Sequence, residues 1–411
     1  MKKSLLIAAA AIVLTAASCE KSPANNPYKS LELTTKSVGY VQQGNNFAIN
    51  FIDKVNASTD DDYIMSPLSM QFLLGMILNG AQYDTADEIC NVLGYGKGET
   101  ESVNEFCQSM LKQLPNLDKK TSLTIANSIF VDDGWPLKKP FVDDVSRYYY
   151  AKVENLDFSD ITGSTQKINK WCKDNTGGLI PKILESVEPD MLAYLLNALY
   201  FKSEWKEKFD KSKTKEETFV REDGVKSQKS MMKCNKSFAY TDNDVFQAVR
   251  LPYGNSAFSM TILLPTAGNN VVDIVAALKK QGDWQALLRE MVICDVDLWL
   301  PKFETKFSIN LNKILSAMGM PRSFDPDKAD FKAMSQYALY LSFIKQDAII
   351  KVDEVGTEAA AVSIGGMKKD MAPAPGDHVV FHADHPFIYI ISESSTDAIL
   401  FAGRYGAQPQ E

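Results

Sequence analysis

Lys351-Val352-Asp353-Glu354-Val355-Gly356-Thr357-Glu358-Ala359-Ala360-Ala361-Val362-Ser363-Ile364-Gly365-Gly366-Met367 is the stretch that decides how this 411-residue sequence is interpreted. Successive side chains of a β-strand point to opposite faces of a sheet. Read as a strand, this segment has one uncharged face of mostly small residues: Thr357, Ala359, Ala361, Ser363, Gly365 and Met367. The charges lie on the other face, which contains Glu358, Ala360, Val362, Ile364, Gly366 and Lys368.

Such a segment can enter the middle of a sheet without burying an unpaired charge, which would cost several kcal/mol. Its Ala, Gly and Ser content gives it little tendency to form a stable strand at rest. The pattern therefore predicts a segment that changes between two conformations. A surface loop whose alternation is accidental would have the same composition, so both interpretations stay open from the residues alone.

The segment continues with Lys368-Lys369-Asp370-Met371 and then with Ala372-Pro373-Ala374-Pro375-Gly376. Polar residues punctuated by proline are typical of an exposed, extended stretch, and exposed loops are the preferred sites of proteolytic cleavage. We therefore expect proteases to cut this part of the chain.

Glu354-Val355-Gly356-Thr357-Glu358-Ala359-Ala360-Ala361 resembles the hinge of the serpins, a family of suicide protease inhibitors. Other segments resemble further serpin motifs in the same order along the chain. They are Tyr63–Ser69 with Asn79–Ala81, Asn197–Trp205 with Phe209, Leu298–Phe303, Ala329–Phe331, His382–Phe387 and Leu400–Arg404. The sequence is identified as a member of the family over almost all of its mature length.

The resemblance implies an α+β fold, the serpin fold, in which helices pack around a large central β-sheet, with two further sheets and an exposed reactive-centre loop. It also implies a mechanism. A target serine protease attacks a bond of the loop and forms an acyl-enzyme, and the cut loop then inserts into the central sheet as a new strand and traps the protease. Cysteine proteases are further possible targets.

Site residues are assigned by the same resemblance. The hinge comprises Glu354, Gly356, Thr357, Glu358, Ala359, Ala360 and Ala361. The residues beneath and beside the parting strands, called the shutter and the breach, are Ser66, Ser69, Asn197, Trp205 and Gln346. Serpins of animals often carry histidine where this chain has Gln346, whose amide can still form a hydrogen bond across the shutter. Core packing and helix capping are the alternative roles for these side chains.

The scissile bond lies among Lys368, Lys369, Asp370 and Met371. The usual family spacing from Glu354 gives the bond Asp370–Met371. A cut after a lysine would instead attract trypsin-like enzymes, and a cut after Met371 would suit elastase-like or chymotrypsin-like enzymes. The sequence leaves these three choices open.

A second function, from another class, is a non-inhibitory serpin that acts as a binding module or chaperone. Non-inhibitory members commonly carry charged, bulky or proline residues at the inward hinge positions. Thr357, Ala359 and Ala361 favour inhibition.

The N-terminus carries an export signal. Lys2 and Lys3 precede an apolar run that ends in small residues, which is typical of a signal peptide over residues 1–18. Leu14–Cys19 resembles the lipobox of bacterial lipoproteins, so we expect acylation of Cys19, with plain secretion as the alternative. Residues 19–37 are then a lipidated tether to a membrane, and 38–411 form a single domain. The expected location is the outer membrane, on its periplasmic or cell-surface face.

Composition narrows the function classes. The net charge is −8, and the sequence has no cluster of basic residues, which disfavours a nucleic-acid partner. The only histidines, His378, His382 and His385, lie within eight residues, and no catalytic or metal-binding motif surrounds them. We therefore predict a monomeric protein that is not an enzyme and holds no cofactor and no metal.

Five cysteines remain besides Cys19, and their spacing does not suit metal ligands. The sequence therefore predicts buried thiols at Cys90, Cys107, Cys172, Cys234 and Cys294.

Periodicity predicts helices early and strands late. The expected helices cover 45–54, 66–79, 85–93 and 168–176, and strands are expected at 122–130, 246–252, 258–265, 296–303, 348–353, 385–393 and 398–404. Residues 193–201 fit a buried strand or a buried helix equally well.

Overall fold

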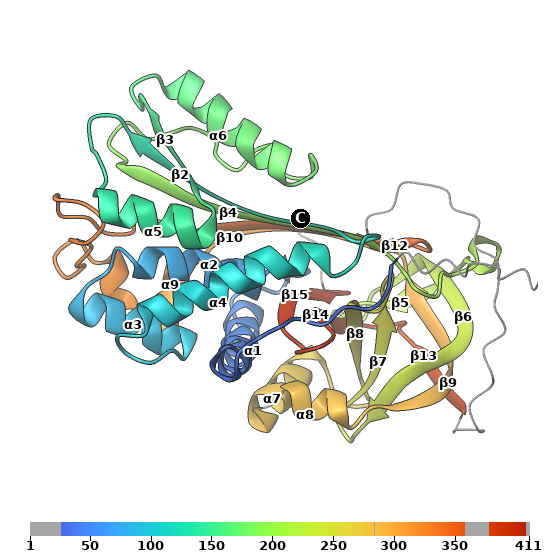
Figure 1. Cartoon of the computed structure of the whole chain (residues 1–411). Helices are drawn as coiled ribbons and strands as arrows, with labels where there is room; N and C mark the ends of the chain where they lie inside the picture. The colour runs from blue at the N-terminus through green and yellow to red at the C-terminus, as the bar shows by residue number, and fades with distance from the viewer. Residues whose placement is uncertain (1–25, 283, 358–377, 408–411) are drawn as a thin grey trace, which may run out of the picture.

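A computed structural model describes residues 26–282, 284–357 and 378–407. Two β-sheets share the core with helices that pack mainly around one of them (Figure 1). The helices are α1 (Thr35–Asn56), α2 (Pro67–Leu78), α3 (Tyr83–Leu93), α4 (Thr100–Gln113), α5 (Lys139–Tyr149), α6 (Ile161–Asn175), α7 (Val271–Gln281), α8 (Trp284–Arg289) and α9 (Asn312–Met318).

The first sheet has six strands in the spatial order β10, β11, β12, β4, β2, β3. Their bounds are β10 (Phe303–Asn310), β11 (Lys345–Val352), β12 (Gly356–Thr357), β4 (Ala193–Glu204), β2 (Ser122–Asp132) and β3 (Lys152–Leu156). All neighbours pair antiparallel except β2 and β3, which run parallel. Residues 193–201, which periodicity left undecided, are a strand because β4 pairs with β2 along Ala193–Lys202.

The second sheet has nine strands. They are β1 (Tyr63–Met65), β15 (Ile399–Tyr405), β14 (Phe387–Glu393), β8 (Phe258–Pro265), β7 (Phe246–Pro252), β6 (Lys226–Asp242), β9 (Val292–Pro301) and β13 (His378–His382), with β5 (Lys215–Val220) paired to β6. The long strand β6 pairs successively with β5, β9 and β7. The two further sheets that the resemblance implies therefore run together through β6.

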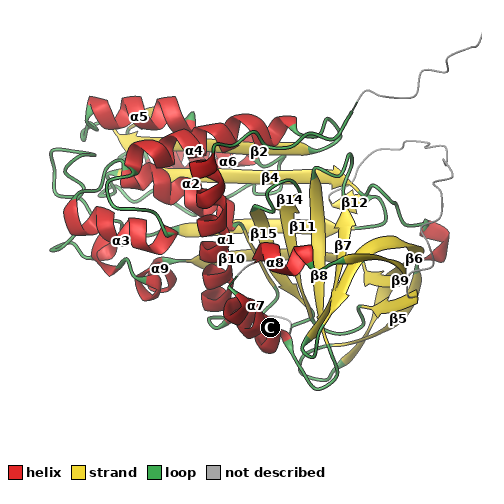
Figure 2. Cartoon of the chain, turned by 60° about the horizontal axis from the view of Figure 1, so that its bottom comes forward, coloured by secondary structure: helices red, strands yellow, loops and turns green. Residues whose placement is uncertain are grey.

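Helix α2 lies at the centre of the molecule, and all twelve of its residues are buried. The Ser66 side chain caps its N-terminus by accepting a hydrogen bond from the Ser69 amide, and Pro67 occupies the first turn, where its missing N–H leaves no bond unmade. Helix α6 covers the opposite face of the six-stranded sheet, so that the sheet has helices on both sides (Figure 1). Figure 2 shows the same arrangement from below, with most of the helices on the left and most of the nine-stranded sheet on the right.

The α+β fold is confirmed, and most expected elements coincide with observed ones. Residues 246–252 and 258–265 are β7 and β8 without change, whereas the expected strand 296–303 joins the end of β9 to the first residue of β10. The boundary expected at residue 38 falls inside α1, because this helix begins at Thr35. The five cysteines from Cys90 to Cys294 are buried, as predicted.

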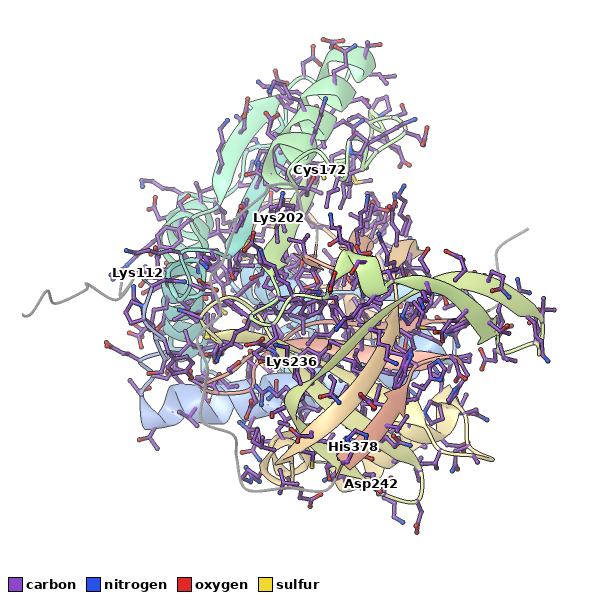
Figure 3. All side chains as sticks on the ribbon, turned by 90° about the vertical axis from the view of Figure 1, so that its right-hand side faces the viewer. Lys112, Cys172, Lys202, Lys236, Asp242 and His378 are labelled. Atoms are coloured by element: carbon purple, nitrogen blue, oxygen red, sulfur yellow. The ribbon has the colours of Figure 1, made fainter. Side chains whose placement is uncertain are left out.

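Figure 3 turns the molecule so that the right-hand side of Figure 1 faces the viewer. Cys172 of α6 lies near the top, and Lys236 of β6 and His378 of β13 lie on the nine-stranded sheet below. The histidines contact different carboxylates: His378 lies 3.2 Å from Asp297, His382 lies 3.2 Å from Glu217, and His385 lies 2.7 Å from Asp384.

Candidate functional site

The hinge begins where β11 turns into β12. The Asp353 carboxylate accepts hydrogen bonds from the amides of Val355 (2.8 Å) and Gly356 (3.3 Å), which closes a tight turn. Strand β12 then enters between two longer strands, with Thr357 opposite Val352 of β11 and opposite Ser203 of β4. The first residues of the predicted hinge are thus already part of the six-stranded sheet.

Gly356 is required by the close approach of β12 to β4. A Cβ atom at this position would lie 2.1 Å from the carbonyl oxygen of Ser203 and 2.7 Å from the Cα atom of Glu204. Both contacts are with backbone, which cannot rotate away as a side chain can. Only glycine therefore allows this pairing without a shift of the strand.

Glu354 fixes the turn to the neighbouring sheet. Its side chain is 5% exposed and lies 2.9 Å from Lys302 Nζ, and it accepts a 2.9 Å hydrogen bond from the Thr214 hydroxyl. Its backbone carbonyl accepts a hydrogen bond from the Phe209 amide. Burial acts to raise the pKa of this carboxyl, but the bonds from Lys302, its own backbone and Thr214 together hold the pKa below its usual value.

Trp205 lies directly beside the hinge, where the resemblance places the breach. Its indole stacks on the ring of Tyr253 with centroids 4.4 Å apart, and its Nε1 donates to the Asp353 carbonyl at 2.9 Å. The Trp205 amide donates to the Val355 carbonyl at 2.8 Å. The Tyr253 hydroxyl lies 2.6 Å from Thr357 Oγ1, so that both the backbone and a side chain of the hinge are held.

The other four predicted residues meet at the N-terminus of α2. Gln346 of β11 exchanges two 3.0 Å hydrogen bonds with the backbone of Ser66. Asn197 of β4 accepts a bond from the Ser69 hydroxyl and donates to Asn127 of β2 at 2.6 Å. The Gln346 amide therefore binds the helix beneath the sheet rather than reaching β4 across the shutter.

From the hinge to beyond the shutter, the edges of β4 and β11 face each other. In the described residues, β4 pairs on this side only through Ser203 and Glu204, and β11 only through Val352. Three cavities of about 20, 40 and 100 Å³ lie along the line between the two strands, and we call this line the slot. The cavity beside the hinge is lined by Thr357 and Leu199, the middle one by Asn197 and Gln346, and the largest by Tyr194 and Phe343.

A strand edge with unpaired amides and carbonyls is a template for another strand. The slot offers two such edges, with mostly apolar side chains at its two ends and polar side chains at its middle. Its geometry suits the entry of one extended chain that follows on from Thr357.

The model of the family described as "Serpin (serine protease inhibitor)" matches residues 42–407. The chain belongs to the serpin family. Serpins are generally protease inhibitors rather than enzymes.

Relatives resemble this serpin over nearly their whole length. Serpin B6 of Macaca fascicularis is 32% identical, with 88% of this chain and 97% of the relative covered, and human Serpin B13 is 30% identical, with 86% and 95% covered. The native thermophilic serpin tengpin superposes with a TM-score of 0.81 at 30% identity, covering 93% of this chain and 97% of its own. Human thyroxine-binding globulin, solved in complex with thyroxine, has a TM-score of 0.80 at 26% identity, covering 91% of this chain and 100% of its own.

Several predicted residues of this serpin lie outside the described residues. They are the hinge residues Glu358, Ala359, Ala360 and Ala361, the scissile region Lys368, Lys369, Asp370 and Met371, and the lipidation site Cys19.

Other residues of the site were not predicted. Tyr253, Lys302, Thr214 and Asn127 contact the hinge or the shutter from other strands and turns. Lys302 stands in the segment Leu298–Phe303 that carried part of the family resemblance, which is the one signal that pointed to it.

Proposed function

We propose that this serpin inhibits serine proteases by covalent trapping, with cleavage of the loop that follows Thr357 and insertion of that loop into the slot. The observation that carries the proposal is the pair of facing edges of β4 and β11, with the hinge already paired at one end. The uncharged alternate positions after Thr357 in the sequence provide the matching strand.

The register of β12 predicts how the loop would insert. Gly356 lies opposite Glu204 and Thr357 opposite Ser203, so a continued antiparallel strand places Ser363 opposite Asn197 and Met367 opposite Ala193. Ten residues then fill the length of β4, and roughly twenty ladder hydrogen bonds to the two edges, at ~0.5–1 kcal/mol each, supply on the order of 10–20 kcal/mol. The uncharged set, which includes Thr357, would face the core, because the Thr357 side chain points to the buried Tyr253.

The test is incubation of the mature protein with trypsin, elastase, chymotrypsin and papain, followed by denaturing gels and mass spectrometry. We expect an SDS-resistant complex with at least one serine protease and a released C-terminal peptide, whose mass identifies the cut among Lys368, Lys369, Asp370 and Met371. Clean cleavage without a complex across a wider panel of proteases would favour the alternative, a non-inhibitory binding module. Thyroxine-binding globulin illustrates that the same fold is also found in complex with a small ligand.

A matched pair of variants tests insertion itself. Ala361→Glu would place a charge on the core-facing side of the inserted strand, where an unpaired charge costs several kcal/mol. Ala360→Glu would place the same charge on the opposite side. We expect Ala361→Glu to turn the inhibitor into a substrate while Ala360→Glu still forms the complex, and equal behaviour of the two variants would contradict the proposed register.

We also propose that the protein is exported by bacteria as a lipoprotein anchored through Cys19. The N-terminal sequence supports this. Separately, none of the helices within residues 26–282, 284–357 and 378–407 has the length and apolar character of a membrane span. Labelling with a fatty acid analogue should mark the native chain and leave Cys19→Ser unlabelled. Protease shaving of intact cells then distinguishes the cell surface from the periplasm.

A further inference from the structure

The first described residues of the chain are docked near the hinge. In Figure 1 the segment ahead of α1 runs from that helix toward the end of the six-stranded sheet where β12 lies. Asn26 donates a 2.6 Å hydrogen bond to the Asp118 carboxylate and accepts a 2.9 Å bond from the Lys119 amide. The Pro27 carbonyl accepts a 2.9 Å bond from the Asn255 side chain.

The docking continues as far as α1. The Leu31 amide donates to Ser395 Oγ at 2.9 Å, and the Leu31 side chain is buried. Glu32 exchanges backbone bonds of 2.8 and 2.9 Å with the Gln113 side chain. Residues 26–32, which we call the N-terminal strap, are therefore held at both ends, whereas the sequence predicted a tether here.

Asp118 is the junction between the strap and the domain. It is 2% exposed, and its carboxylate accepts bonds from Asn26, the Lys120 amide (2.9 Å), the Thr121 hydroxyl (2.9 Å) and the Asn255 amide (3.2 Å). These donors are all neutral. The cost of burying the carboxylate is therefore compensated by hydrogen bonds and not by an ion pair. The bond from Asn26 is the shortest of the four.

Two routes lead from Asp118 to the hinge. In the first, Thr121 Oγ1 lies 2.6 Å from Ser203 Oγ, and Ser203 is the register partner of Thr357. In the second, Asp118 packs on the turn after Tyr253, where a Cβ on Gly254 would lie only 1.8 Å from its carboxylate oxygen. Tyr253 holds Thr357 through its hydroxyl.

We propose that Asp118 is a positioning residue for the hinge and that the N-terminal strap keeps it in place, so that the docked strap stabilises the pairing of β12 with β4. The role in inhibition rests on the proposed function, because β12 matters as the starting point of loop insertion. Release of the strap would loosen the hinge and raise the rate at which β12 leaves β4.

Hydrogen–deuterium exchange of the full mature chain tests this without any protease. The reporter is the peptide 203–209, because the amides of Trp205 and Phe209 donate to the hinge carbonyls of Val355 and Glu354. We expect Asn26→Ala, and Asp118→Asn as a second variant, to speed its exchange by about threefold to tenfold, the effect of losing roughly one hydrogen bond. Lys29→Ala is the matched control, since Lys29 lies on the strap and bonds only the Asn116 carbonyl (3.2 Å) in the described residues.

Two results would overturn the proposal. One is exchange of peptide 203–209 in Asn26→Ala that equals the exchange in Lys29→Ala. The other is an equal increase throughout the domain, including the buried strand β14, which would indicate general destabilisation. Exchange in Asn26→Ala tests the coupling of the strap to the hinge even if Asp118→Asn does not fold. Because exchange is measured without a protease, failure to form an inhibitory complex would refute the proposed function and leave this coupling standing.

Discussion

Replacement of Gly356 by alanine should detach the hinge from the six-stranded sheet. The new Cβ atom would lie 2.1 Å from the Ser203 carbonyl oxygen, whereas ordinary contact begins at 3.4 Å. Strand β12 must therefore move by about 1.3 Å, which lengthens the 2.8 Å bond from the Trp205 amide to the Val355 carbonyl beyond hydrogen-bond distance.

Loss of about two backbone hydrogen bonds at ~1 kcal/mol each weakens the docking of the hinge by ~2 kcal/mol. That free energy corresponds to an increase of about thirtyfold in the exchange rate of the Trp205 amide, which hydrogen–deuterium exchange of peptide 203–209 measures. In the protease assay the same variant should give more cleaved and less complexed inhibitor.

Gly39→Ala is the matched control. Gly39 lies inside α1, and a Cβ there would meet nothing within 4 Å. Alanine stabilises a helix interior by roughly 0.5–1 kcal/mol relative to glycine, so this variant should melt at a higher temperature with unchanged exchange at 203–209. Unchanged protection of the Trp205 amide in Gly356→Ala would refute the packing argument.

Two further predictions concern the hinge, and one concerns the buried cysteines. Glu354 has a folded pKa below its usual value, so its contribution to hinge docking is complete above the unfolded pKa and is lost as the pH falls through the folded pKa. After correction for intrinsic exchange, peptide 203–209 should therefore lose protection in that acidic range. The Glu354→Gln variant should not show this pH dependence. Tyr253→Phe leaves the buried Thr357 hydroxyl without its 2.6 Å partner and should lower stability by about 1–2 kcal/mol, whereas the double variant with Thr357→Val should recover part of the loss in thermal melts. Burial raises the pKa of Cys90 to about 11 and the pKa values of Cys107, Cys172 and Cys234 to about 12, so these thiols should react with a disulfide reagent at about pH 8 only after unfolding; rapid labelling of the native protein would contradict their burial.

Local signals predicted the parts of the fold that local chemistry determines. The Ser66–Pro67 start of α2 and the alternating strands β7 and β8 depend on neighbouring residues, and they lie where the sequence indicated. The strand β4 could not be told from a helix, because its identity depends on pairing with β2 about seventy residues earlier. The sequence contains no local signal that residues 26–32 are docked, because their partners, such as Asp118 and Ser395, are distant along the chain.

The functional site could likewise be predicted only in part from the sequence. Gly356 and Thr357 were identified by resemblance, but the reason for the glycine is the backbone of β4, which no local pattern contains. Glu354 was placed in the hinge, yet its partners Lys302 and Thr214 come from segments far away in sequence. Family motifs therefore identified the positions, and only the tertiary structure supplied their contacts.

The arrangement of the shutter indicates where loop insertion is controlled. Gln346 of β11 and Asn197 of β4 are both bonded to α2, one to Ser66 and the other to Ser69, and these serines are three residues apart on one rigid helix. By the register of β12, a strand that enters the slot would place the core-facing Ser363 opposite Asn197, in the cavity that Asn197 and Gln346 line. At the hinge end of the slot, the contacts of Trp205, Tyr253 and Glu354 hold the hinge itself. The barrier to insertion should therefore depend both on substitutions around the hinge and on substitutions at Gln346 or Asn197, since the inserted strand passes both places.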